Sequence, residues 1–201
     1  MIAQKGGAGK TALAINLAVA SADASEPAAV IDLDPQASAA AWAAQRHAPA
    51  PAVHPCGGRQ LARTLERSGA GLVVIDTAPR AEASALAAAR AADLVLIPCR
   101  PALVDLHAVT ATIEIAALAG AEAVAVLNAV PPTGTLADEA RGALSGMGVR
   151  GLQQTIGQRV AFVHAYTLGL GVIEHRPRSR AAAEIRALHD LVAAPARAAA
   201  A

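Results

Sequence analysis

The sequence predicts a single-domain α/β fold, with a mostly parallel sheet that carries helices on both faces. Short apolar runs alternate with longer alanine-rich stretches, as they do in repeated βαβ units. Two of these runs carry aspartates at or beside their carboxyl ends, where open α/β sheets bind ligands. The 201 residues suffice for one domain with a substantial core. We therefore expect one domain over residues 1–194 and a frayed, low-complexity tail over 195–201.

The expected elements follow in order along the chain. Four apolar runs have about the usual length of a strand: Ala28–Leu33, Leu72–Asp76, Leu94–Pro98 and Ala123–Asn128. Seven other segments are expected to be helical: Lys10–Ala22, Gln36–Arg46, Arg59–Ser68, Ala81–Ala91, Leu103–Leu118, Leu136–Ser145 and Arg180–Ala193. The stretch His47–Gly58 is rich in proline and glycine, which predicts a surface connection.

Composition restricts the possible functions. Apolar residues make up 54% of the chain and aromatic residues only 1%, so the core must be built from alanine, valine, leucine and isoleucine. The net charge of +1 gives no global field that would attract nucleic acid, so any DNA contact needs a local arginine cluster. Cys56 and Cys99 are far apart and are expected to be free thiols. No apolar run approaches the ~20 residues of a membrane span, and we expect a cytoplasmic protein that does not bind membranes.

The loop Lys5-Gly6-Gly7-Ala8-Gly9-Lys10-Thr11 holds both lysines of the chain. It fits the phosphate-binding pattern G-x-x-x-x-G-K-[ST] in a shifted form, with Lys5 at the place of the first glycine. Glycines let the backbone aim successive N–H groups at phosphate oxygens, Lys10 would neutralise the β- and γ-phosphates, and Thr11 would hold Mg²⁺. The alternative is a glycine-rich turn that opens a helix.

The position of Lys5 at the start of the loop predicts that the protein acts with a second subunit. A lysine at the start of the loop does not easily reach phosphates held by its own loop, but it would reach those of a copy packed face to face. A cation arriving from a partner would stabilise the charge on the transferring phosphoryl group. Taken without its neighbours, Lys5 would be a solvated loop lysine.

Three motifs together resemble one family. Lys5–Thr11 is similar to the deviant Walker A loop of the ParA/MinD superfamily of P-loop ATPases, Asp32-Leu33-Asp34-Pro35-Gln36 resembles its second motif, and Asp76-Thr77-Ala78-Pro79 resembles its Walker B segment. The resemblance covers nearly the whole chain and is greatest to short ParA-type plasmid and chromosome partitioning proteins. It implies a P-loop NTPase fold. Such relatives carry a full strand before the loop, whereas Met1–Gln4 supplies only a stub, so either the true start lies upstream or that strand is short.

The resemblance assigns roles to matching residues. Asp34 would orient the attacking water and, with Lys5 and Lys10, complete the catalytic set. Thr11, Asp32 and Asp76 would hold Mg²⁺. ATP would be bound by Asn128, which would contact the adenine edge, and by the loop and its first helical turn: Gly6, Gly7, Ala8, Gly9, Lys10, Thr11 and Ala12. Two alternatives remain from the residues alone: the aspartates as caps at strand ends and Asn128 as a turn residue before two prolines.

Five arginines in the C-terminal third are candidates for binding DNA phosphates without sequence preference. They are Arg159, Arg176, Arg178, Arg180 and Arg186. In ParA-like proteins, basic residues of this region bind DNA in the ATP-bound dimer. The alternative is a solvated run of charge.

The resemblance therefore predicts a slow, partner-stimulated ATP hydrolase with ATP and Mg²⁺ as cofactors. An ATP-dependent homodimer would bind nucleoid DNA non-specifically, and a ParB-like partner on a plasmid or chromosome segment would stimulate hydrolysis. The alternative is a related positioning ATPase for a protein cargo, or a MinD-like regulator. A metal-cluster carrier lacks support because the two cysteines are not placed to ligate a cluster, and a kinase or ligase lacks a recognisable acceptor pocket.

Overall fold

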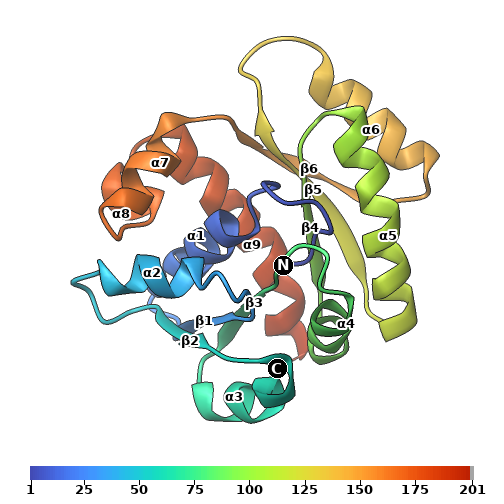
Figure 1. The fold of residues 1–201 in the computed structure, drawn as a ribbon. Coiled ribbons are helices and arrows are strands. Elements are labelled where there is room, and N and C mark those ends of the chain that lie inside the picture. The colour runs from blue at the N-terminus through green and yellow to red at the C-terminus, as the bar shows by residue number, and fades with distance from the viewer. Residues whose placement is uncertain (200–201) are drawn as a thin grey trace. The chain divides into compact units, whose positions relative to one another are not determined.

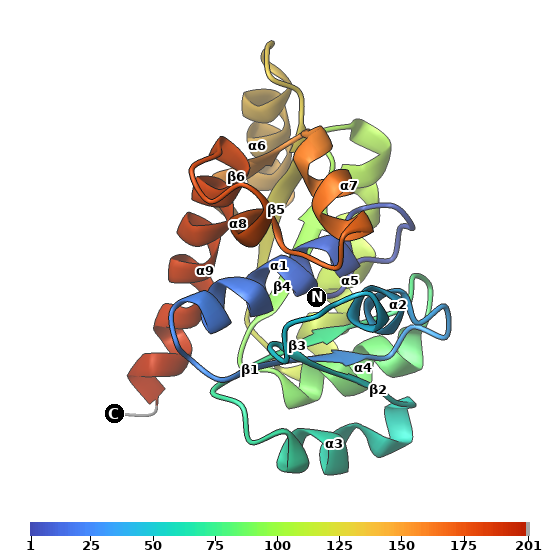
Figure 2. The ribbon, with the colours of Figure 1, turned by 90° about the vertical axis from the view of Figure 1, so that its left-hand side faces the viewer.

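The computed structural model describes residues 1–199, which form two compact α/β units (Figure 1). One unit contains residues 1–10 and 77–158, and the other contains residues 11–76 together with the chain from Arg159 onward. All strand pairings are parallel, and most successive strands are linked through helices, so the predicted α/β class is confirmed (Figure 2). The expected boundary of one domain at residue 194 stays a prediction.

The first unit has a three-stranded sheet in the order β4-β5-β6. Its strands are β4 (Val95–Cys99), β5 (Ala123–Val130) and β6 (Gly151–Gly157). The helices are α4 (Glu82–Ala91), α5 (Leu103–Ala119) and α6 (Leu136–Gly146). Helices α5 and α6 lie on the same side of this sheet, and α4 packs against α5 (Figure 1). Because β4 is buried along its whole length, its continuous apolar run is explained.

The N-terminal segment joins the same unit. Met1, Ile2 and Ala3 are buried, and the Ile2 N–H donates a hydrogen bond to the Leu96 carbonyl at 3.1 Å. The Thr77 hydroxyl donates to the Met1 carbonyl at 3.1 Å. These residues carry no strand assignment, so the expected stub is present as a short buried segment beside β4.

The second unit has a sheet in the order β2-β1-β3. Its strands are β1 (Ala28–Asp32), β2 (Ala52–Pro55) and β3 (Leu72–Asp76). Its helical elements are α2 (Ser38–Ala44), η1 (Gly58–Gln60), α3 (Leu61–Ser68), α7 (Val160–Thr167), α8 (Val172–His175), α9 (Arg180–Ala199) and, from Thr11 onward, α1 (Lys10–Asp23). In the β1–β3 register Asp32 pairs with Asp76, so two carboxylates lie side by side at the carboxyl ends of these strands.

Several sequence expectations need correction. The stretch His47–Gly58 is not only a connection, because it contains β2, a half-exposed edge strand that tolerates Pro55 at its end. Strand β6 and helices α7 and α8 were not anticipated. Helix α9 continues to Ala199, beyond its expected end at Ala193. The frayed tail expected over residues 195–201 stays a prediction, and residues 200–201 lie outside the described part. Among the described helices, none combines the length and the apolar character that a bilayer span requires.

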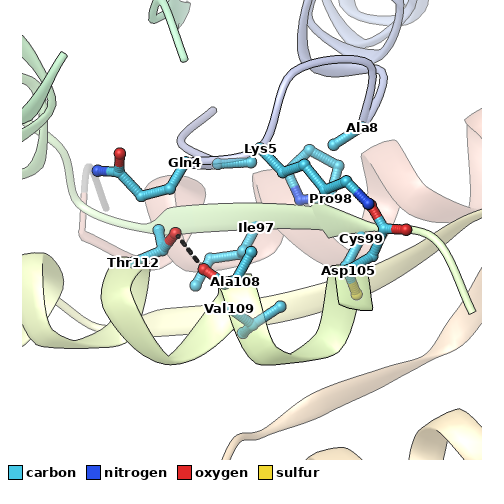
Figure 3. Close-up of a pocket in the computed structure, with 11 residues that line it drawn as sticks. Gln4, Lys5, Ala8, Ile97, Pro98, Cys99, Asp105, Ala108, Val109 and Thr112 are labelled. Atoms are coloured by element: carbon cyan, nitrogen blue, oxygen red, sulfur yellow. Dashed lines mark hydrogen bonds and ion pairs between the residues drawn. The ribbon is translucent and has the colours of Figure 1, made fainter. Parts of the chain in front are cut away.

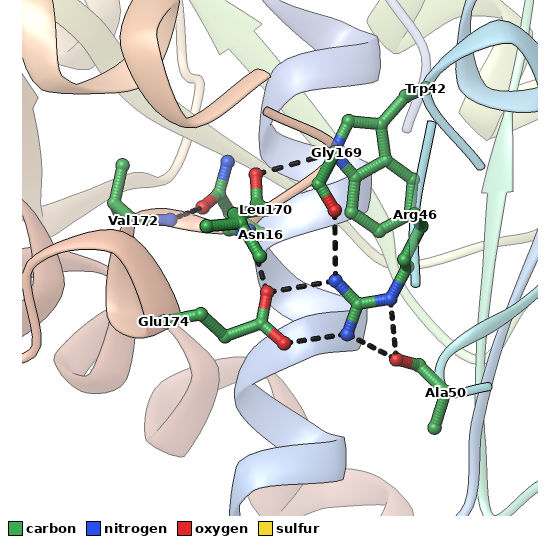
Figure 4. Close-up of polar contacts among 9 residues, drawn as sticks. Asn16, Trp42, Arg46, Ala50, Gly169, Leu170, Val172 and Glu174 are labelled. Carbon is green, nitrogen blue, oxygen red and sulfur yellow. Dashed lines mark hydrogen bonds and ion pairs between the residues drawn. The ribbon is translucent and has the colours of Figure 1, made fainter. Parts of the chain in front are cut away.

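A polar network binds the loop between α7 and α8 to helix α2 (Figure 4). The Arg46 side chain is only 4% exposed, and its guanidinium donates to both carboxylate oxygens of Glu174, at 2.8 and 2.5 Å. It also donates to the Gly169 carbonyl at 3.0 Å. The Trp42 indole N–H donates to the Leu170 carbonyl at 3.2 Å. Because Trp42 lies in α2 and Arg46 lies just beyond its C-terminal end, they hold this loop against the α2 region.

Helix α1 holds the next turn of the same loop. The Asn16 side-chain oxygen accepts the Val172 N–H at 2.8 Å (Figure 4). Gly171 approaches Val19 so closely that a Cβ at Gly171 would lie 2.8 Å from a Val19 methyl group. The chain between α7 and α8 is therefore fixed to both α1 and α2.

Replacing Arg46 by methionine should lower the free energy of unfolding by roughly 2–3 kcal/mol, because it leaves a part-buried Glu174 carboxylate without its cation. Burial raises the pKa of Glu174, but the hydrogen bonds from Arg46 and from the Gly171 N–H outweigh it and lower the pKa below 4.5. This stabilisation is therefore complete above pH 4.5 and is lost as the pH falls through the lower, folded-state pKa.

Urea unfolding at pH 7 and at about pH 3 measures both effects. Arg63→Met, at an exposed arginine of α3, is the matched control and should change little. An Arg46→Met penalty that is the same at both pH values would contradict the assignment.

Candidate nucleotide site

The phosphate loop of the first unit depends on two glycines. Gly7 and Gly9 have φ of 75° and 91°, a region that side chains with a Cβ rarely adopt. A Cβ at Gly9 would lie 2.1 Å from the Asn128 amide nitrogen. A Cβ at Gly7 would lie 3.6 Å from an Arg100 guanidinium nitrogen, which places a cation beside the loop that the sequence reading did not anticipate. The loop backbone therefore fits close approach of an anion.

Asn128 supports the loop directly. Its amide nitrogen donates a hydrogen bond to the Ala8 carbonyl at 2.8 Å. Asn128 lies within β5, so it is not the turn residue that the sequence left as an alternative. The predicted contact with an adenine edge stays a prediction, and in this structure the donor of the amide is engaged by the loop.

Lys10 and Thr11 are the first two residues of α1, so the loop leads directly into a helix N-terminus. The exposed N–H groups and the helix dipole at such an end favour phosphate. Lys10 is buried, and its ammonium donates to the Ala3 carbonyl at 3.2 Å. The N-terminal segment therefore orients the lysine that the motif assigns to the phosphates.

Lys5 forms an ion pair within its own chain. Its ammonium lies 3.0 Å from a carboxylate oxygen of Asp105 in the first turn of α5, and the Asp105 side chain is only 8% exposed (Figure 3). Lys5 is therefore held in an ion pair and is not the free, solvated loop lysine that the sequence left as an alternative. Its predicted contact with a partner subunit stays a prediction, and that contact would require Lys5 to leave Asp105.

Cys99 lies beside this pair (Figure 3). Burial, and secondly the charge of Asp105, raise the pKa of the Cys99 thiol to about 12. The thiol therefore stays protonated and unreactive at neutral pH. Both cysteines are free, as expected.

The second unit brings Thr11 and Asp76 together. The Thr11 hydroxyl donates to an Asp76 carboxylate oxygen at 2.6 Å, and Asp76 is fully buried. A hydroxyl and a carboxylate in contact are the protein ligands that Mg²⁺ takes beside phosphate oxygens. These two residues fit the predicted metal site.

Asp32 and Asp34 have different surroundings. Asp32 is 2% exposed, and its carboxylate accepts the backbone N–H groups of Asp34, Ala39 and Ala40 at 3.0–3.2 Å. It therefore satisfies N–H groups in the first turn of α2, whereas the sequence offered a strand-end cap as the alternative, and its support of Mg²⁺ stays a prediction. Asp34 is less buried, and its carboxylate accepts the Gln36 N–H at 2.9 Å. Asp34 keeps oxygen lone pairs for a water molecule.

The five candidate DNA-binding arginines divide into two groups. Arg159 pairs with Glu184, and Arg186 pairs with Asp23 at 3.3 Å and donates to the Pro177 carbonyl. Within residues 1–199, the other three are exposed and form none of the ion pairs that the structure shows: Arg176, Arg178 and Arg180. The structure therefore narrows the candidate phosphate-binding set to the segment that opens α9.

Comparison with known proteins places the chain in a family. A family model described as the CobQ/CobB/MinD/ParA nucleotide binding domain matches residues 1–196. The chain belongs to this family. It is also 36% identical over 188 residues to the "Maintenance of carboxysome distribution protein A" of Gloeobacter kilaueensis, covering 90% of this chain and 85% of that protein.

Solved structures of the MinD/ParA type share the fold. The septum site-determining protein MinD of Pyrococcus horikoshii, complexed with Mg-ADP, has a TM-score of 0.76 at 17% identity, covering 95% of this chain and 93% of that one. The ATP complex of a Cyanothece McdA variant has a TM-score of 0.71 at 17% identity, covering 95% and 94%. The ParA/MinD assignment and its P-loop ATPase fold are thereby confirmed. The cofactor prediction of ATP and Mg²⁺ is confirmed at the level of the family.

Replacing Gly9 by alanine should weaken ATP binding by about 100-fold, because the added Cβ collides with the Asn128 amide and the left-handed φ disfavours it. Equilibrium titration with a fluorescent ATP analogue measures the change. Gly6→Ala is the matched control in the same loop, since no atom lies within 4 Å of a Cβ there. Equal losses in both variants would contradict the steric explanation.

Proposed function

We propose that this MinD/ParA-family protein is a positioning ATPase for a protein cargo. ATP would drive formation of a homodimer, the dimer would bind nucleoid DNA, and a partner on the cargo would stimulate slow hydrolysis and release. The observation that carries the proposal is the 36% identity, over most of both chains, to a protein named for maintaining carboxysome distribution. The cytoplasmic, nucleoid-associated location predicted from the sequence follows from this cycle.

The residues of the chain support ATP hydrolysis in such a cycle. The Gly7–Thr11 segment and Lys10 would hold the phosphates, and Thr11 with Asp76 would hold Mg²⁺, which supplies charge neutralisation at the phosphates when bound. Asp34 would orient a water molecule. Slow turnover is expected because Lys5 is engaged by Asp105 in the single chain.

Non-specific DNA binding would rest on Arg176, Arg178 and Arg180. Three cations per monomer bind weakly, but a dimer doubles the phosphate contacts, so ATP would control DNA affinity through avidity. This property serves equally the second candidate function, partitioning of a plasmid or chromosome segment with a ParB-like partner. The identity to the carboxysome-distribution protein favours the protein cargo over that reading and over a MinD-like regulator.

Salt-dependent DNA binding tests the DNA step. With ATP, wild-type protein should bind random duplex DNA, and ADP should weaken that binding. The triple change of Arg176, Arg178 and Arg180 to alanine should reduce the slope of log K against log salt by about 2–3 per monomer. A matched triple on exposed arginines of the η1–α3 segment should leave the slope unchanged: Arg59, Arg63 and Arg67. If the two triple variants had equal slopes, the assignment of the three α9-proximal arginines to DNA binding would be wrong.

Deletion of the gene in its source organism tests the cargo. Clustering or uneven inheritance of a protein body, with stable plasmids, is expected for the positioning function. Rising numbers of plasmid-free cells with normally placed protein bodies would overturn it in favour of DNA partitioning.

A further inference from the structure

The loop between β1 and α2 carries Asp34 in a strained backbone. Ala37 has φ 50° and ψ 41°, the left-handed region that a residue with a Cβ avoids. The turn is closed by the Ala37 N–H donating to the Asp34 carbonyl at 2.8 Å, and by the Gln36 N–H donating to the Asp34 carboxylate. Such a conformation persists only where surrounding contacts hold it. The position of the Asp34 carboxylate therefore depends on what holds this turn.

One set of contacts that fixes the Asp34 turn comes from the end of strand β1. The Asp32 carboxylate accepts the N–H groups of Asp34, Ala39 and Ala40, and so ties both ends of the turn to the end of β1. Asp32 is the last residue of a fully buried strand, so this support is rigid.

The other contact that fixes the turn is a hydrogen bond from α7, more than a hundred residues further along the chain. The Tyr166 hydroxyl donates to the Ser38 carbonyl at 2.7 Å. Ser38 follows the strained Ala37 directly and is the first residue of α2. The α7–α8 loop, which follows α7, is itself fixed by Trp42 of α2 and by Arg46 just after α2, so Tyr166 approaches from an anchored element.

We propose that Tyr166 is a positioning residue for ATP hydrolysis, which acts by holding the Asp34 turn through its hydrogen bond to Ser38. The proposal rests on the assignment of Asp34 as the water-orienting carboxylate. Tyr166 touches no nucleotide in this scheme. Its effect is on the geometry of the turn and therefore on the chemical step rather than on ATP binding.

The hydroxyl keeps its proton under working conditions. Burial, and secondly the charge of Asp32, raise the pKa of Tyr166 above its ordinary value of 10.0. The group therefore remains a hydrogen-bond donor to the Ser38 carbonyl throughout the neutral range.

Tyr166→Phe tests the proposal because it removes only the hydroxyl. Single-turnover hydrolysis of ATP should slow by roughly fivefold, as expected for the loss of one hydrogen bond, with an unchanged dissociation constant for ATP. Thr167→Val is the matched control. It removes a neighbouring hydroxyl on α7 whose hydrogen bond goes to the Val163 carbonyl of the same helix, and it should behave as wild type.

Hydrogen exchange of the Gln36 and Ala37 amides provides a readout that needs no activity. It should accelerate in Tyr166→Phe and not in Thr167→Val, since only the first variant frees the turn. In an Asp34→Ala background, adding Tyr166→Phe should have no further effect on the hydrolysis rate.

Three results would overturn the proposal. The first is wild-type hydrolysis and exchange in Tyr166→Phe, and the second is a parallel loss of ATP affinity and thermal stability that accounts for the slower rate. The third is an undiminished effect of Tyr166→Phe without Asp34. If wild-type protein hydrolyses no ATP, the proposed function fails, while the exchange measurement still decides whether Tyr166 holds the turn.

Discussion

Replacing Asp34 by alanine should slow ATP hydrolysis by about 100-fold or more, while ATP binding and folding are preserved. The Asp34 side chain is part-exposed and accepts one backbone hydrogen bond within its own turn, so its loss leaves no buried group unpaired. Without hydrolysis the ATP-bound dimer should accumulate. Single-turnover kinetics and size-exclusion chromatography in ATP measure the two effects.

Asp32→Ala separates this effect from loss of structure. Because Asp32 is buried and accepts three backbone N–H groups, its removal should lower the free energy of unfolding by about 2 kcal/mol or more. Asp34→Ala should leave that free energy nearly unchanged. Destabilisation by both variants, or hydrolysis at the wild-type rate in Asp34→Ala, would contradict the assigned roles.

Replacing Lys5 by alanine should abolish the ATP-dependent dimer and slow hydrolysis by about 1,000-fold, if Lys5 acts on the phosphates of a partner subunit as arginine fingers do. ATP affinity of the monomer should be retained, because Lys10 and the loop backbone remain. Analytical ultracentrifugation with and without ATP gives the association state directly.

The Lys5–Asp105 ion pair supplies the control. Lys5→Ala alone leaves the Asp105 carboxylate buried without its cation, which is destabilising by itself. Asp105→Asn removes that penalty, so the double variant Lys5→Ala/Asp105→Asn should fold well and still fail to dimerise. Asp105→Asn alone should dimerise at lower protein concentration than wild type, since Lys5 no longer has to leave a carboxylate. Normal dimers in the double variant would remove the cross-subunit role.

Much of the fold was predictable because its signals are local. The runs at β1 and β4 are fully buried, and those at β3 and β5 are buried over part of their length, so their apolar composition marks them. Strands β2 and β6 were missed because they are only partly buried, and β6 contains Gln153 and Gln154 where an apolar pair would have marked it. Their pairing with β1 and β5 is a long-range contact that no local pattern encodes.

The sequence by itself determined the chemistry of this protein: the loop with both lysines, the aspartates at the strand ends and the family they imply. Within each motif the residues are consecutive or nearly so, and their spacing is dictated by the covalent chain. Only the tertiary structure decided their partners, namely Asp105 for Lys5, Ala8 for Asn128 and the Tyr166 hydroxyl for the Asp34 turn. Each of these contacts joins residues about 100 or more positions apart, and packing alone brings such residues within hydrogen-bonding distance.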